Sequence, residues 1–338
     1  MEASEFAHSN SKLNTAESQT ASNRPPARGG SQSEVAVGIS FFDFKSRTEN
    51  LREYLHDSWV LEHVRKSSEL SLRAYADGAT LEHHWGTVRQ ALVHYCNWHT
   101  CEAFYRALSG EGFSNEIHHQ LSWSTRGLMW DALAAKGIFD LGDRRRRPVL
   151  YSHNLSFTLW RGIALRLDAQ ARQFGDWFLS ERPGEPRHSL TVSADRYVHL
   201  AAFGCTVAAG WLGRPTSPQE AGGVTVLDSL AAAVKTPAEA PMVAAVLACC
   251  DWHCSRSGAR EDDEFYDPPN QLMPFEILSA LQLRKVVYGY TVPELDHPLL
   301  QSPLGNLPLL PQRVDNSMLE AVFMRLKHEL PSLAVFLI

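Results

Sequence analysis

The sequence predicts a mainly α-helical protein, an antiparallel bundle or array of helices that follows a disordered N-terminal tail. Along most of the chain apolar residues recur at steps of three and four, the spacing that places them on one face of a helix. Capping residues and glycines bound several of these stretches. Strand-like runs are scarce, and the best two, at 190–192 and 224–226, are too short to build a sheet.

Composition divides the chain into a tail and two predicted lobes. Residues 1–34 are rich in Ser, Asn, Gln, Ala and Gly and cannot bury enough apolar surface to offset the entropy of ordering. Prolines and a glycine then separate an N-terminal helical lobe, 35–182, from a C-terminal one, 190–338. The pattern C-[ND]-W-H occurs at 96–99 and again at 250–253, which suggests two related halves. Coincidence in a chain rich in Trp and His is the alternative.

Three of the helices predicted in the N-terminal lobe have clear bounds in the sequence. The first carries an apolar stripe over 81–103 and stops near Gly110. The second covers 114–136 and ends at Gly137, because glycine commonly follows the last helical residue. The third runs over 154–179 and stops before a proline.

The C-terminal lobe has the clearest helix start of the chain. The residues Thr-Pro-Ala-Glu at 236–239 form a capping box with proline at the first helical position, and this helix is expected to end at Gly258. An earlier helix opens near Ser193 and ends at Gly213. Two further helices are predicted at 275–288 and 317–330.

Five prolines between residues 291 and 311 predict an extended strap without helix. Each proline removes a backbone donor and restrains the residue before it. Leucines lie between the prolines, so we expect the strap to run along the core.

Charge and length favour a protein that binds another protein. The chain has 338 residues, 44% of them hydrophobic, and a net charge of −6, which argues against a general nucleic-acid binder and fits a basic partner. The N-terminal residues lack the apolar core of a signal peptide, and no stretch reaches the roughly 18 apolar residues that span a membrane. We therefore expect a cytoplasmic protein with reduced thiols, and with no membrane as a partner.

Two clusters of cysteine and histidine could supply zinc ligands. Zinc prefers four such ligands in a tetrahedron, but the C-x2-C knuckles of structural zinc sites are absent from the sequence. Several of the cysteines also lie on apolar helical stripes, where a free thiol packs as a small hydrophobic group. We expect no metal and no cofactor. The clusters are His94, Cys96, His99 and Cys101, and Cys249, Cys250, His253 and Cys254.

A metal-dependent helical enzyme is the main alternative to a binding protein. Di-iron bundles use two E-x-x-H pairs, and this chain has Glu53 with His56 and Glu116 with His119 on predicted helices. The motif is short enough to arise by chance. The sequence contains no G-x-S-x-G, H-E-x-x-H, P-loop or G-x-G-x-x-G motif, so we expect no catalytic residues.

An acidic segment, residues 261–267, is the predicted partner-binding site. It carries two aromatic side chains among its carboxylates, and a basic partner would be steered to it. A solvated loop is the alternative. The arginine run at 144–147 could bind a phosphate or a carboxylate-rich partner, and a solvated loop is its alternative as well. The acidic segment consists of Glu261, Asp262, Asp263, Glu264, Phe265, Tyr266 and Asp267.

A family resemblance lies in the C-terminal third of the chain. The residues at 274–278, 283–285, 292–300 and 302–304 read Pro-Phe-Glu-Ile-Leu, Leu-Arg-Lys, Val-Pro-Glu-Leu-Asp-His-Pro-Leu-Leu and Ser-Pro-Leu. Together they resemble helical immunity proteins of bacterial type VI secretion and polymorphic-toxin systems, of the TsiT kind. The resemblance covers under a tenth of the chain, and its motifs are structural rather than catalytic.

The resemblance implies a cytoplasmic, non-enzymatic protein that binds and blocks a cognate toxin, often a nuclease. A nuclease cleft is basic because it holds phosphates, so the acidic segment is the expected contact, with no direct binding of nucleic acid. A scaffold or adaptor protein differs from this prediction only in its partner.

Overall fold

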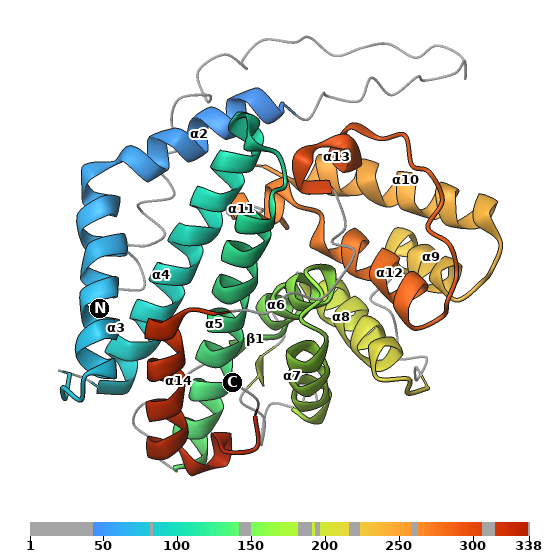
Figure 1. Cartoon of the computed structure of the whole chain (residues 1–338). Helices are drawn as coiled ribbons and strands as arrows, with labels where there is room; N and C mark the ends of the chain where they lie inside the picture. Colours follow the sequence, from blue (N-terminus) through green and yellow to red (C-terminus); the bar gives the residue numbers. More distant parts are fainter. Residues whose placement is uncertain are drawn as a thin grey trace, which may run out of the picture.

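The computed structural model describes residues 43–81, 84–141, 150–181, 191–192, 197–215, 224–258, 263–265, 267–305 and 315–336. These residues are mainly α-helical, as predicted (Figure 1). Their only β-structure is a two-residue parallel pairing of β1 (Leu150–Tyr151) with β2 (Thr191–Val192). None of their helices is both long enough and apolar enough to cross a bilayer.

The N-terminal helices pack as neighbours on one side of the molecule (Figure 1). The predicted helix over 81–103 is confirmed, and a π-helical turn, Ala107–Glu111, ends it. The predicted helix over 114–136 is also confirmed, but it continues past Gly137. That glycine is a packing residue, because a Cβ there would lie 2.9 Å from Cβ of Leu330. The helices are α2 (Phe44–His56), a π-helix (Val60–Lys66), α3 (Ser67–Ala76), α4 (His84–Arg106) and α5 (Asn115–Asp140).

The predicted helix over 154–179 is wrong in one respect, because two helices occupy this stretch. Helix α6 (Ser152–Ala164) and helix α7 (Asp168–Ser180) are separated at Arg166, whose φ of 62° is left-handed. The N–H of Leu167 donates to the carbonyl of Gly162 at 2.9 Å, a bond that closes α6 in the manner of a Schellman motif. An arginine in this conformation gives no sequence signal comparable to a glycine.

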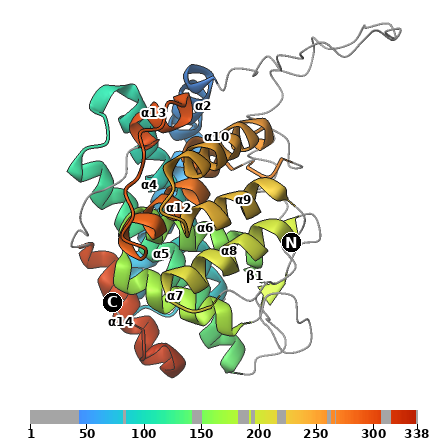
Figure 2. The same ribbon diagram turned by 90° about the vertical axis from the view of Figure 1, so that its right-hand side faces the viewer.

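The C-terminal helices surround α12, whose residues from Phe275 to Arg284 are all buried (Figures 1 and 2). Helix α14 returns to the other side of the molecule and packs against α3 and α5. These helices are α8 (Val198–Trp211), α9 (Thr225–Val234), α10 (Glu239–Arg256), α11 (Pro268–Leu272), α12 (Phe275–Val286), α13 (Pro298–Gln301) and α14 (Ser317–Glu329). Short 3₁₀ turns follow α13 at Pro303–Gly305 and α14 at Pro331–Leu333.

Three local predictions in this half are wrong. The capping box does not form, because α10 begins at Glu239 and Thr236 Oγ1 instead donates to the carbonyl of Ala233 at the end of α9. The strand-like run at 224–226 opens α9. The strap contains α13, since Pro298 occupies a first-turn position where its missing N–H costs nothing.

Part of the predicted organisation lies outside the described residues. This holds for the tail at 1–34, the arginine run at 144–147 and the lobe boundary at 182–190. The division into two lobes stays a prediction. Across that boundary, the hydroxyl of Tyr75 on α3 donates to the carboxylate of Glu329 on α14 at 2.9 Å.

Buried Arg284 ties the C-terminal half together. Its side chain on α12 is 0% exposed, and its guanidinium donates to the carbonyls of Thr291 at 2.7 Å and Pro237 at 3.1 Å. It also donates to the carbonyls of Ala233 and Thr236. One side chain thus holds the turn between α9 and α10 and the start of the strap, which explains why the local capping box is overridden.

We expect Arg284→Ala to lower the free energy of unfolding by about 3 kcal/mol, because four backbone carbonyls lose a buried charged donor. Urea denaturation measures this change. The matched control is Lys285→Ala, at the exposed neighbouring position of the same helix, with an expected change within about 0.5 kcal/mol. Equal midpoints for the two variants would contradict the role given to Arg284.

Helices α6 and α8 approach each other closely at Gly204. A Cβ at this position would lie 2.7 Å from Cβ of Ser156, while Ser156 Oγ is engaged with the carbonyl of Ser152. At Gly175 on α7 the same added atom would meet its nearest neighbour at 3.5 Å, an ordinary contact.

Gly204→Ala is therefore expected to destabilise the protein by about 1–3 kcal/mol through overpacking. Gly175→Ala is expected to leave stability unchanged or to raise it by up to about 1 kcal/mol, because alanine favours helix. Thermal denaturation of the pair checks this order, and the reverse order would show that the helices can separate at no cost.

Candidate functional site

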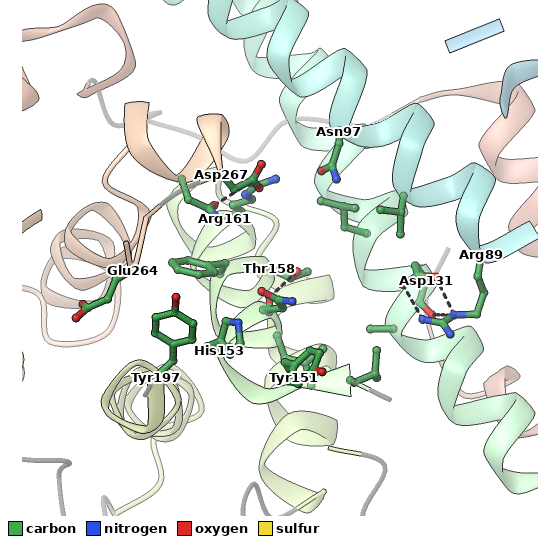
Figure 3. Close-up of a pocket in the computed structure, with 18 residues that line it drawn as sticks. Arg89, Asn97, Asp131, Tyr151, His153, Thr158, Arg161, Tyr197, Glu264 and Asp267 are labelled. Atoms are coloured by element: carbon green, nitrogen blue, oxygen red, sulfur yellow. Dashed lines mark hydrogen bonds and ion pairs between the residues drawn. The ribbon is translucent and has the colours of Figure 1, made fainter. Parts of the chain in front are cut away.

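A polar cavity of about 330 Å³ lies where α4, α5, α6 and α11 meet (Figure 3). Helix α4 contributes Arg89, Val93 and Asn97, four residues apart and so on one face. Helix α6 contributes a parallel stripe that includes Asn154, Thr158 and Arg161. The remaining lining residues are Leu128, Asp131, Ala132, Leu150, Tyr151, His153, Leu155, Phe157, Tyr197, Glu264, Asp267 and Asn270.

One wall of the cavity is aromatic. The ring of His153 lies 5.7 Å from that of Tyr151 and 4.8 Å from that of Tyr197, centroid to centroid. Phe157 of α6 continues this wall toward the core. Tyr151 is 46% exposed, so the aromatic wall begins at the protein surface.

At the opposite end of the cavity lies Arg161, which is only 4% exposed (Figure 3). Its Nη2 donates to Asn270 Oδ1 at 2.9 Å, and its guanidinium lies 4.9 Å from the centre of the Phe275 ring. Its Nε and Nη1 are closed to solvent and have no hydrogen-bond partner. Burial lowers the pKa of Arg161, and the nearby charge of Asp267 opposes this shift.

Asp267 lies beside Arg161 without pairing with it. It is the residue before α11, a position where aspartate usually caps the helix, yet its side chain makes no capping hydrogen bond. Figure 3 shows it next to Arg161 at the edge of the cavity. Burial raises the pKa of Asp267, and the charge of Arg161 acts in the opposite direction. Its carboxyl group is thus an acceptor without a hydrogen-bonded partner.

The other two carboxylates of the cavity are already paired. Asp131 on α5 accepts from Nε and Nη2 of Arg89 on α4, at 2.9 and 3.1 Å. Glu264 contacts Nε2 of His199 at 3.1 Å and Nη1 of Arg256 at 3.7 Å. Asp267 therefore differs from both in having its oxygens available.

The structure places four residues of the acidic segment: Asp263, Glu264, Phe265 and Asp267. Phe265 is 0% exposed, with its ring 4.2 Å from His253 and 5.4 Å from Trp252, so it anchors the segment in the core and is not available to a partner. Glu264 and Asp267 line the cavity, so the segment forms one of its walls. Glu261, Asp262 and Tyr266 lie outside the described residues. Partner binding by this segment stays a prediction.

The cysteines are free thiols packed in the core or beside it. Burial raises the pKa of all six, to about 11 for Cys205 and Cys254, so they remain protonated near neutral pH. A protonated thiol is a poor nucleophile and a poor metal ligand. In the described part of the chain, no three His, Cys, Asp or Glu side chains gather as a metal site would require.

The two E-x-x-H pairs have other surroundings. Glu53 and His56 are exposed on α2. On α5, Glu116 contacts Arg106 at 3.2 Å, and Nε2 of His119 accepts from the backbone N–H of Asp315 at 3.2 Å.

Arg161 and the aromatic wall are not among the site residues that the sequence predicts. One signal was present: Arg161 interrupts the apolar stretch between Trp160 and Ala164, where a charge must find a buried partner. The opposite charge near it, Asp267, is more than a hundred residues away in the sequence. No family model, curated protein or solved structure matches the chain. The cavity is therefore the feature from which a function can be inferred.

We expect the thiols to react slowly with Ellman's reagent in the native protein at neutral pH, because they are protonated and buried. Half-buried Cys205 and Cys254 should react before the others, and all six cysteines should react in denaturant. Absorbance at the thionitrobenzoate band follows the reaction. Rapid labelling of Cys96 or Cys249, identified by peptide mapping, would contradict this description of the core.

Proposed function

We propose that the protein acts by binding, without covalent chemistry, a polar ligand in the cavity between α4, α5, α6 and α11. The observation that carries this proposal is the pair of Arg161 and Asp267, two opposite charges inside one cavity that do not bond to each other. The side chain of Asp267 makes no capping hydrogen bond and faces the cavity. A ligand that donates to Asp267 supplies the partner that this carboxyl group lacks.

The dimensions and lining of the cavity support the same proposal. Its volume of about 330 Å³ is within the usual range for small-ligand sites, about 300–1,000 Å³. An aromatic wall together with a few directed polar groups is typical of such sites. The acidic segment, which forms another wall of the cavity, is held in place before any ligand arrives. Buried Phe265 anchors its neighbour Glu264 to the core.

The second candidate function is neutralisation of a bacterial toxin, which we propose on the C-terminal resemblance. It is supported by the position of Glu264 and Asp267, two acidic residues of the predicted binding segment that line a cavity reached from the surface. The resembling residues form α12, the strap and α13, a scaffold without chemistry of its own. In this function the partner is a basic protein such as a nuclease toxin, met in the cytoplasm, and the chain is not an enzyme.

Ligand binding is tested by closing the cavity. We expect at least one compound from a panel of amines, carboxylates, amides and phosphates to raise the melting temperature of the protein. Thr158→Trp, which places an indole in the cavity, should abolish that shift, while Thr225→Trp, at an exposed position of α9, should retain it. A panel without any stabilising compound, or equal shifts for both variants, would rule out this function.

Toxin neutralisation is tested with the toxin protein encoded beside the gene. Reversal of Glu261, Asp262 and Asp263 to lysine is expected to raise the dissociation rate at least tenfold, because like charges then face a basic surface. Surface plasmon resonance measures this rate. Glu62→Lys, at a side chain that is 62% exposed outside the segment, is the control. Unchanged dissociation from the triple variant would remove the acidic segment from the interface.

A further inference from the structure

We propose that the cavity is a site for an organic cation, an ammonium or guanidinium group, with Asp267 as its counter-ion. This inference rests on the proposed function and names the ligand class of the same cavity. The group can belong to a small amine or to a lysine or arginine side chain of a protein partner. The chemistry is the same in both cases, and the experiment distinguishes the two sources.

The first argument is the distribution of charge in the cavity. Its lining contains three carboxylates and two arginines. Arg89 is neutralised by its two bonds to Asp131. Glu264 is turned toward His199 and Arg256, and Figure 3 shows its side chain directed away from Arg161. Asp267 is the carboxylate that remains for a ligand, and an acceptor of this kind selects a charged donor.

The second argument concerns Arg161, the group that would favour an anion instead. Its free donor atoms, Nε and Nη1, are closed to solvent, and Nη2 is bound to Asn270. A ligand in the cavity therefore cannot reach the unpaired donors. Arg161 instead acts on Asp267 through its charge, which lowers the pKa of that carboxyl and so opposes the larger, raising effect of burial. We assign Arg161 as a positioning residue and Asp267 as the binding residue.

The aromatic wall is the third argument. Tyr151 and Tyr197 lie on the side of the cavity away from Arg161 (Figure 3), and Phe157 of α6 also lines the cavity. The face of an aromatic ring attracts a cation by about 0.5–2 kcal/mol, depending on how far the pair is removed from water. A carboxylate at one end and aromatic rings along one side suit an alkylammonium or a guanidinium better than an anion.

The other titratable groups around Asp267 leave this charge balance unchanged near neutral pH. Tyr54 on α2 and Cys101 on α4 interact electrostatically with Asp267. Burial raises the pKa of both, so both are neutral there. Arg161 on α6 is the charged neighbour, and its removal should raise the pKa of Asp267.

The experiment compares three probes of equal length by isothermal titration calorimetry: butylammonium, butyramide and butyrate. We expect the full-length protein to bind butylammonium at least tenfold more tightly than the other two. Asp267→Asn should weaken butylammonium binding at least tenfold, while Glu264→Gln should change it less than threefold. Arg161→Met should still bind butylammonium at high pH. As the pH is lowered, this variant should lose binding at a higher pH than the wild type, because the carboxylate of Asp267 is protonated earlier.

A second arm identifies the source of the cation. Acetyl-Gly-Lys-Gly-amide is compared with the norleucine peptide of the same length, and tighter binding of the lysine peptide than of butylammonium assigns the site to a protein partner. The reverse order assigns it to a small amine. Either order supports the organic-cation site.

Preference for butyrate or butyramide, or unchanged amine binding by Asp267→Asn, would overturn the cation assignment while ligand binding itself stands. If neither the three probes nor any compound of the panel of amines, carboxylates, amides and phosphates binds, the proposed function is contradicted as well. If Asp267→Asn does not fold, the pH dependence of butylammonium binding by the wild type tests the proposal instead. The affinity of the wild type for butylammonium must fall as pH is lowered through the pKa of Asp267, and a flat profile would contradict the proposal.

Discussion

The burial of Arg161 constrains the centre of this molecule. A guanidinium removed from water costs several kcal/mol unless charge and acceptors are supplied around it. Here Asn270 supplies an acceptor, Phe275 a ring face and Asp267 an opposite charge. Asn270 lies on α11 and Asp267 directly before it, so the hydrogen bond and charge of Arg161 link this five-residue helix to α6. The cavity is the space that remains between these groups.

A second buried cluster fixes the wall of that cavity. His253 on α10 contacts Glu276 Oε1 at 2.7 Å and the carbonyl of Gln271 at 3.0 Å, and both carboxylate and imidazole are almost completely buried. Phe265 packs on this imidazole ring. The three helices α10, α11 and α12 thus share one polar contact, and the segment that carries Glu264 and Asp267 is attached to it. These contacts lie outside the cavity lining, so they hold Asp267 in place whether or not a ligand is bound.

Periodicity predicted much of the fold, and its errors have physical causes. Several helices were predictable because many of their apolar residues recur at the spacing that places them on one helical face. They are the helices at 81–103, 275–288 and 317–330. A capping box such as 236–239 contains few residues, so the four carbonyl contacts of Arg284 outweigh it. The break at Arg166 and the packing role of Gly137 depend on neighbours distant in sequence. The same holds for the site: the acidic segment was recognisable, but its position beside Arg161 was not.

The return of α14 to the N-terminal helices affects how the chain can fold during synthesis. Tyr75 and His84 meet Glu329, and Arg325 lies 4.2 Å from the ring of Tyr75, contacts between residues about 250 positions apart. Until the ribosome has released α14, helices α3 and α5 expose the apolar surface that it covers. Contacts of such large sequence separation slow folding. The nascent chain therefore passes through a stage in which chaperones have a hydrophobic surface to bind, and that surface disappears only after α14 has been synthesised.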